Sequence, residues 1–161
     1  MNILKQIAAA MPESWQAELK RIHFARKIKR GTFLTGEAEF GLLDSLVKHG
    51  DWVIDVGANV GHYTKRLSDL AGPTGRVFAF EPVPATFQLL TANTARFQFQ
   101  NVSLFNVATS GRFAVVGMNM PKFPTGLKNY HEASISRGGG EVEVVALRID
   151  DIGIGQCPEN C

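Results

Sequence analysis

Residues 53–61 have the sequence V53-I-D-V-G-A-N-V-G61, in which a short apolar run leads into a turn with two glycines. Apolar, β-branched runs bounded by turn formers are typical of strands buried on both faces of a parallel sheet. Gly57 and Gly61 allow the backbone to turn tightly and to approach a ligand at the start of a helix. The segment therefore predicts a strand, a tight turn and a helix, with a nucleotide-type site where they meet.

The segments that follow repeat this alternation of strand and helix. A second apolar strand is expected at 77–80, directly before Glu81, and a third at 102–106. Apolar residues at helical spacing predict helices over 63–70 and 85–97. The order of these elements predicts an α/β fold of Rossmann-like, doubly wound type with a mainly parallel sheet and right-handed crossovers.

The last third of the chain predicts a different kind of sheet. Strands are expected at 113–118 and 142–147, separated by a glycine- and proline-rich stretch, 119–140, that is expected to be a mobile loop. In the second strand, glutamates alternate with valines, which predicts one wet face and antiparallel pairing near an edge. Within the loop stretch, Ser134 and Arg137 are weak candidates for contact with a substrate.

The first 50 residues are expected to form a helical extension ahead of a partial Rossmann-like domain at 51–161. Helices are expected over 2–30, with an interruption at Met11-Pro12, and over 37–48. Residues 1–30 hold seven lysines and arginines against two glutamates. The favoured interpretation is a helix that packs its apolar stripe of Trp15, Leu19 and Ile22 on the domain and solvates its charges, so no nucleic-acid or membrane partner is expected. The alternative is a surface helix drawn to anionic lipid or nucleic acid.

Composition narrows the class of protein. The 161 residues, 45% of them hydrophobic, can bury one sizeable core. No apolar run approaches the roughly 20 residues of a membrane-spanning helix. The only cysteines, Cys157 and Cys161, form a weak metal-ligand pair near the end of the chain, so we expect no metal site and a reducing, cytoplasmic location.

The charges around the predicted turn distinguish between ribose-bearing ligands. Glu81, at the end of the second strand, is placed to accept the hydroxyl protons of a ribose. A dinucleotide would bring a pyrophosphate against the turn, where its fingerprint has glycine in place of Asn59 and where Asp55 would repel it. S-adenosylmethionine carries a sulfonium and an ammonium instead, which Asp55 favours, while backbone N–H groups of the turn can hold its carboxylate. S-adenosylmethionine is therefore preferred, and a NAD-binding domain remains the weaker alternative.

Four segments in order resemble successive blocks of the FkbM-type class I methyltransferases. These blocks are V53-I-D-V-G-A-N-V-G-H-Y-T64, G75-R-V-F-A-F-E-P82, N101-V-S-L-F-N-V-A108 and A146-L-R-I-D-D-I152. The resemblance spans about 100 residues, and the E37-A-E39-F stretch is similar to the helical preface of such proteins. It implies an S-adenosylmethionine-dependent methyltransferase that methylates an oxygen, often of a sugar or other small metabolite.

The resemblance also implies roles for individual positions. Asp55 and the turn would line the methionine end of the cofactor, Glu81 would bind the ribose hydroxyls, and Asn106 with Val107 would lie near the adenine. His62 and Tyr63 follow the turn and are placed to touch a ligand. The full set of expected cofactor-binding residues is Asp55, Gly57, Ala58, Asn59, Gly61, Tyr63, Glu81, Pro82, Asn106 and Val107. No catalytic residue is assigned.

The chain departs from the family pattern at its end. The family's next block, which resembles I-K-x-D-V-E-G and brings acidic residues to the catalytic side, is replaced by G153-I-G-I-G-Q-C-P-E-N-C161. We therefore expect a chain truncated at its C-terminus, lacking its last strands, with an open apolar sheet edge that promotes formation of a homo-oligomer. A non-catalytic remnant that acts as a binding or interaction module is the alternative to an enzyme that acts on a small-molecule acceptor.

Overall fold

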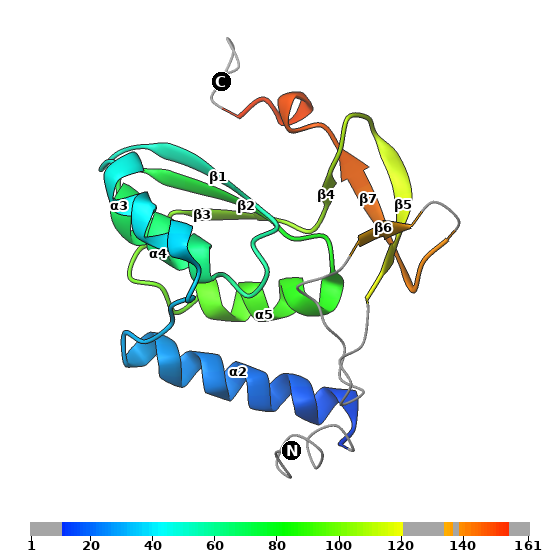
Figure 1. Ribbon diagram of the computed structural model, residues 1–161, viewed down its shortest axis with the longest axis horizontal. Helices are drawn as coiled ribbons and strands as arrows, with labels where there is room; N and C mark the ends of the chain where they lie inside the picture. Colours follow the sequence, from blue (N-terminus) through cyan, green and yellow to red (C-terminus); the bar gives the residue numbers. More distant parts are fainter. Residues whose placement is uncertain (1–10, 121–133, 137–138, 155–161) are drawn as a thin grey trace.

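The computed structural model describes residues 11–120, 134–136 and 139–154 (Figure 1). The described helices, of α or 3-10 type, are α2 (Glu13–Lys29), η1 (Ala38–Leu42), α3 (Leu43–Leu46), α4 (His62–Ala71), α5 (Pro84–Thr94) and η3 (Ile149–Ile152). The strands are β1 (Trp52–Val56), β2 (Arg76–Phe80), β3 (Val102–Phe105), β4 (Ala108–Thr109), β5 (Ala114–Asn119), β6 (Ser134–Ser136) and β7 (Val142–Leu147). Among these described elements, no helix is long and apolar enough to cross a membrane.

The first three strands form a parallel sheet in the order β1-β2-β3. Helices α4 and α5 provide the crossovers, and α4 packs against both β1 and β2. Val77 and Ala79 on the helix-covered face are fully buried, and Ala79 shares a core cluster with Leu90 of α5. The fold is therefore Rossmann-like, as the sequence predicts.

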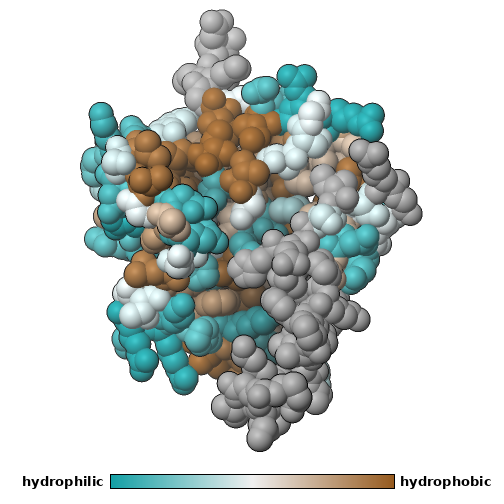
Figure 2. All heavy atoms as spheres, viewed as in Figure 1, coloured by the Kyte–Doolittle hydropathy of each residue, from teal (hydrophilic) through white to brown (hydrophobic). Residues whose placement is uncertain are grey.

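The other face of this sheet differs from the prediction. Trp52, Ile54 and Val56 alternate along β1 on the face away from α4 and α5, and their exposed fractions are 58%, 43% and 56%. In Figure 2, hydrophobic side chains gather in the upper part of the view, where Figure 1 places the three-stranded sheet. The expectation that this strand is buried on both faces is thus wrong for the described structure, because the described helices cover only one face.

A second sheet follows in the order β4-β7-β5-β6. Strand β7 pairs antiparallel with β5, as expected, but it lies between β4 and β5 and not at an edge, because the short β4 pairs parallel with its other side. Val144 and Ala146 of β7 are buried beside Met118, whereas Glu143 is exposed, which confirms the single wet face. The stretch expected to be a loop contains β6, which pairs with the end of β5, although Arg137 lies outside the described residues.

The N-terminal segment packs on α5 by its long helix. Figure 1 shows α2 as an outer layer, with α5 between it and the sheet. Phe24 and Ile28 of α2 contact a cluster that joins Phe33 to Val60 and Leu89. The single helix expected over 37–48 is instead a 3-10 turn followed by one α-helical turn, none of whose residues is buried, so periodicity over-predicted its length and its packing.

Candidate functional site

The turn after β1 adopts left-handed backbone at three positions. Gly57, Asn59 and Gly61 have φ angles of +77°, +51° and +98°, and Asn59 is the single non-glycine residue with positive φ in the described part of the chain. A Cβ added to Gly61 would lie 2.8 Å from Cδ1 of Leu90, so the turn is seated directly on α5. A Cβ added to Gly57 would meet nothing within 4 Å, so this part of the turn borders open space.

Backbone amides of the turn are largely engaged within the protein. The N–H groups of Gly57 and Ala58 both donate to the carbonyl of Phe80, at 2.9 Å each. Gly61 donates to the carbonyl of Ala58, and Asn59 donates to the Glu81 carboxylate. Strand pairing and the tight turn therefore already use these four amides, and the expectation that turn amides hold a ligand carboxylate stays a prediction.

The start of α4 offers backbone donors instead. The hydrogen bond from Lys65 N to Gly61 O, 2.9 Å long, begins the helical ladder, so the amides of Tyr63 and Thr64 belong to the first turn, which has no earlier helix carbonyl to pair with. Gly61 is the N-cap residue and contributes no side-chain cap. An anionic group is therefore best accommodated at this helix end, where the helix dipole also favours it.

Asp55 is the penultimate residue of β1 and lies on the helix-covered side of the sheet. Its Oδ2 accepts a 2.6 Å hydrogen bond from the hydroxyl of Thr64 on α4, and both side chains are buried. Burial raises the pKa of Asp55, and the hydrogen bond from Thr64 opposes that shift. The site thus holds a carboxylate that is fixed in position and whose ionised form is poorly solvated.

Glu81 lies at the corresponding end of β2. Its Oε2 accepts from Asn59 N and its Oε1 accepts from Val83 N, each at 2.9 Å. Burial raises the pKa of Glu81, the two backbone hydrogen bonds lower it, and the charge of Asp55 raises it further. The carboxylate is therefore anchored on both oxygens, each of which retains a lone pair for a further donor such as a hydroxyl.

These two acids form an uncompensated negative site. Across the described ranges, no lysine or arginine lies within ion-pair distance of Asp55 or Glu81. Buried carboxylates without a cation are costly, because each loses hydration that no counter-charge replaces. A cation placed beside them would recover this cost, whereas an anion such as a pyrophosphate would add to it.

Beside Gly57 lies a cavity of about 160 Å³ that is lined by further residues of the expected site. Pro82 and Val107 line it together with Gly57, and Met118 closes it from the second sheet. This volume is well below the roughly 300–1,000 Å³ of whole ligand pockets, so it suits one moiety of a larger ligand. Phe80 and Met118 were not identified from the sequence, because each carries only the ordinary signature of a core residue.

Asn106 joins the ends of two strands. Its Nδ2 donates to the carbonyls of Glu81 and Pro82, at 2.8 and 3.0 Å. The side chain amide thus fixes the Glu81-Pro82 corner beside the cavity. The expected role near an adenine stays a prediction, and the structure adds this positioning contact to it.

Tyr63 connects the helix start to the N-terminal segment. The Glu37 carboxylate, as an acceptor for the Tyr63 hydroxyl, together with desolvation and the charges of nearby acids, raises the pKa of Tyr63 to about 12. The ring of Phe40 meets the ring of Tyr63 edge-on, with centroids 5.2 Å apart. The Glu37–Phe40 stretch therefore lies beside the first turn of α4, and Tyr63 stays protonated at neutral pH.

Two polar residues that sequence analysis missed also hold the turn in place. Thr64 binds Asp55, as described, and Asn93 of α5 donates from Nδ2 to the carbonyl of Val60 at 2.8 Å. Both are buried polar side chains on the inner faces of their helices. Each lies at a position where the helical pattern alone predicts an apolar residue. A polar residue at such a position was the one sequence signal that could have identified it.

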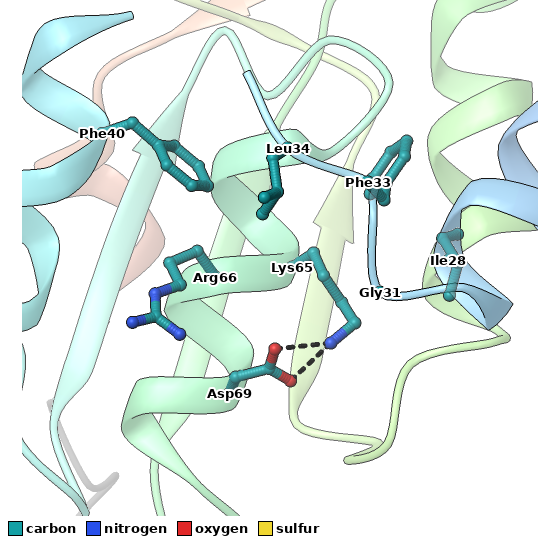
Figure 3. A pocket seen from close by; sticks show the side chains of 8 residues that line it. All are labelled: Ile28, Gly31, Phe33, Leu34, Phe40, Lys65, Arg66 and Asp69. Carbon is teal, nitrogen blue, oxygen red and sulfur yellow. Dashed lines mark hydrogen bonds and ion pairs between the residues drawn. The ribbon is translucent and has the colours of Figure 1, made fainter. Parts of the chain in front are cut away.

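A different pocket, of about 170 Å³, lies on the outer side of α4 (Figure 3). Its charged groups are paired within the protein: Lys65 donates to Asp69 at 2.7 Å, and Arg66 donates from Nε to Asp44 at 2.8 Å. The remaining lining is mostly apolar, including Phe33 and Phe40. Because its charged groups are paired with one another, this pocket does not favour a charged ligand in the way that the unpaired acids of the Asp55–Glu81 site do.

Two known methyltransferases are similar in sequence to part of this chain. The chain is 32% identical over 63 residues to protein-L-isoaspartate O-methyltransferase of Methanothrix thermoacetophila, covering 39% of this chain and 29% of that protein. It is 36% identical over 76 residues to ribosomal RNA large subunit methyltransferase E of Methanothermobacter thermautotrophicus, covering 44% and 36%. The chain thus spans about a third of the length of these curated relatives.

A solved structure and a family profile complete the comparison. A SAM-dependent O-methyltransferase from Thermotoga maritima is 24% identical, with a TM-score of 0.42, over 45% of this chain and 29% of that one. The profile of the methyltransferase FkbM domain matches residues 55–156, more than half of the chain. The match begins at Asp55 and contains the turn, Glu81 and the cavity residues. The chain therefore belongs to the FkbM family of S-adenosylmethionine-dependent methyltransferases.

Proposed function

We propose that this chain binds S-adenosylmethionine at the Asp55–Glu81 site and transfers its methyl group to an oxygen of a sugar or other small metabolite. The observation that carries the cofactor part is the pair of buried carboxylates with no cation beside them in the described structure. A ligand with an ammonium and a sulfonium supplies the missing positive charge.

The other groups of the cofactor have matching places. Glu81, held by two backbone amides, has lone pairs left for ribose hydroxyl protons. The cavity beside Gly57, Pro82 and Val107 suits a flat, largely apolar base. The first turn of α4, with the amides of Tyr63 and Thr64, suits the methionine carboxylate. A dinucleotide fits less well, because its pyrophosphate would meet two acids and a turn whose amides are mostly engaged.

Methyl transfer places modest chemical demands on the protein. The cofactor supplies an activated methyl group on a positively charged sulfur. The chain's own residues orient that group and exclude water, so that the acceptor oxygen approaches in line with the carbon–sulfur bond. Tyr63 is a poor base because the pKa of its phenol is about 12, so its role is to position Glu37 and the helix start.

The acceptor class rests on family membership and not on the two curated relatives. Those relatives are named for a protein isoaspartate and for ribosomal RNA, and each is matched over about a third of its length. Relatives with such different acceptors, each matched over only part of its length, fit a common cofactor site with acceptor recognition elsewhere. An oxygen acceptor on a small metabolite is therefore the proposal that the FkbM resemblance supports.

Calorimetric titration tests the cofactor site. S-adenosylmethionine, its demethylated product and NAD are titrated into the wild type, Asp55→Asn, Glu81→Gln and the control Glu143→Gln, an exposed acid on β7. Glu81→Gln should weaken both S-adenosyl compounds by roughly 10- to 100-fold, the value of hydrogen bonds to a charged group. Asp55→Asn should weaken the sulfonium compound more than the neutral product. Tight NAD binding without S-adenosylmethionine binding would refute the proposal.

Methyl transfer is tested separately. Transfer from radiolabelled S-adenosylmethionine is measured with a panel of sugars and other hydroxylated metabolites, with Glu81→Gln as the inactive control. Cofactor binding without transfer to any acceptor would favour the alternative, a binding module without catalysis.

A further inference from the structure

Helix α2 presents its apolar residues in two directions. Phe24 and Ile28 face inward and pack on the core cluster of Phe33. Trp15, Leu19 and Ile22, spaced by four and three residues, lie on one outward face, with exposed fractions of 66%, 49% and 40%. The expectation that this stripe packs on the domain is therefore wrong: a different stripe holds the helix in place.

Cations lie beside this exposed stripe. Arg21, Arg26 and Lys29 of α2, with Arg96 just beyond α5, line a shallow groove of about 250 Å³. Glu18 is the one acid among the groove's lining residues, and it lies 3.3 Å from Arg21. Within the described segments, Arg26, Lys29 and Arg96 have no carboxylate at ion-pair distance. The groove therefore carries net positive charge.

Ordinary helix chemistry explains only part of this surface. Cations in the last turn of a helix are favoured by its dipole, which accounts for Arg26 and Lys29. It does not account for Arg96, which comes from a different element, nor for a tryptophan, a leucine and an isoleucine exposed along one line. Single exposed apolar residues are common, but three in line beside a basic groove indicate a binding surface.

We propose that the outer face of α2 binds the surface of an anionic lipid bilayer. Trp15, Leu19 and Ile22 would enter the boundary between headgroups and acyl chains, while Arg26, Lys29 and Arg96 contact headgroup phosphates. RNA offers phosphates to the same cations, but RNA recognition relies on cations and aromatic stacking. The two exposed aliphatic side chains would therefore contribute little to RNA binding. The combination of aliphatic and basic groups therefore favours lipid.

Vesicle flotation with the full chain tests this proposal. Binding is measured to neutral phosphatidylcholine vesicles and to vesicles with added phosphatidylglycerol, at low and high salt. We expect binding to the anionic vesicles alone, weakened by salt. The double variant Arg26→Gln/Lys29→Gln should lower the partition coefficient by roughly 30-fold, at about a factor of five for each cation.

Two further variants separate the contributions. Trp15→Ser/Leu19→Ser/Ile22→Ser should lower binding to anionic vesicles at least tenfold, because the apolar groups that enter the bilayer are lost. The matched control Lys48→Gln/Arg112→Gln, which removes two exposed cations elsewhere, should change binding less than twofold. Circular dichroism checks that each variant remains folded.

Several outcomes would overturn the proposal. Equal binding to neutral and anionic vesicles, no binding to either, or loss of binding in the control variant would each contradict it. Tight, salt-dependent binding of a single-stranded RNA that depends on Arg26 and Lys29 but not on Trp15, Leu19 and Ile22 would identify the surface as an RNA site instead.

Discussion

The two faces of the β1-β2-β3 sheet have similar sequences and different environments. On the face toward α4 and α5, Val77 and Ala79 are fully buried. On the opposite face, Trp52 and Val56 keep more than half of their surface exposed. The difference shows that apolar sequence indicates which residues favour burial, whereas only the arrangement of neighbouring elements decides which of them are buried.

The two acids of the site lie on the covered face, and this placement matters for their chemistry. Asp55 is in register with Ala79, so its carboxylate points toward α4, where Thr64 binds it. Burial there raises the pKa of Asp55 and makes a cationic ligand favourable. The same acid on the bare face would be hydrated, and its preference for a cation would be weaker.

Truncating one side chain on each face should give the largest contrast. Leu90→Ala removes a fully buried side chain that packs on Ala79, and we expect a loss of about 2–5 kcal/mol in the free energy of unfolding. Ile54→Ala, on the bare face, should cost about 1 kcal/mol or less, because much of that side chain is already in water. Urea unfolding followed by circular dichroism measures both. Similar losses would mean that the bare face is covered in solution.

Gly61→Ala should have the next largest effect, since it disturbs the contact between the turn and the covered face. The φ of +98° is unfavourable for alanine, and the added Cβ would lie 2.8 Å from Leu90. We expect a loss of about 1–3 kcal/mol, measured by the same unfolding experiment. Gly111→Ala, at an exposed position without a close neighbour, is the matched control and should change stability little.

The covered half of the fold was predictable because its signals are local. Strand β1, the turn, helix α4 and strand β2 each follow from apolar runs bounded by glycine and acidic residues. Short β4 and β6 were missed, because strands of two or three residues carry no period and form only by pairing with β7 and β5. The bare face could not be foreseen, since it depends on which helices are present to cover it.

The two acids of the site could be predicted from the sequence, whereas the hydrogen bonds of the turn amides could not. Asp55 and Glu81 stand out as charged residues at the ends of apolar strands, and the structure brings both to one edge of the sheet. The engagement of the Gly57 and Ala58 amides with Phe80 depends on how the turn closes against β2, which a linear sequence does not reveal. The contacts of Thr64 and Asn93 likewise depend on helix packing.

The buried acids of the covered face should make stability depend on pH. Because burial raises the pKa of Asp55 and of Glu81, the folded state binds protons more tightly than the unfolded state does. Their protonated forms therefore stabilise the fold below the ordinary carboxyl pKa of about 4, and this contribution is lost as the pH rises through the raised values. Asp55→Asn should flatten that decline in urea unfolding between pH 4 and neutrality.

Binding of a cationic cofactor should depend on pH in the opposite direction to the stability of the free protein. S-adenosylmethionine favours the ionised acids, so its affinity should rise with pH over the same interval, measured by calorimetry in wild type and in Asp55→Asn. An affinity that is independent of pH, with an unchanged slope in the variant, would show that Asp55 does not face the cofactor's positive charge.

Substitutions on the bare face should have the smallest effect on stability. Their main effect should be on self-association of the chain. Trp52→Ser and Val56→Ser should change the free energy of unfolding of the isolated chain by about 0.5 kcal/mol or less, since both side chains are mostly exposed. Strand β1 also lies at the edge of its sheet, so this apolar face adjoins a strand that can pair with a second copy of the chain. Light scattering over a dilution series should detect self-association in the wild type and reduced association in Trp52→Ser/Val56→Ser. A wild-type chain that stays monomeric at high concentration would show that bare apolar surface on this sheet is not sufficient for pairing.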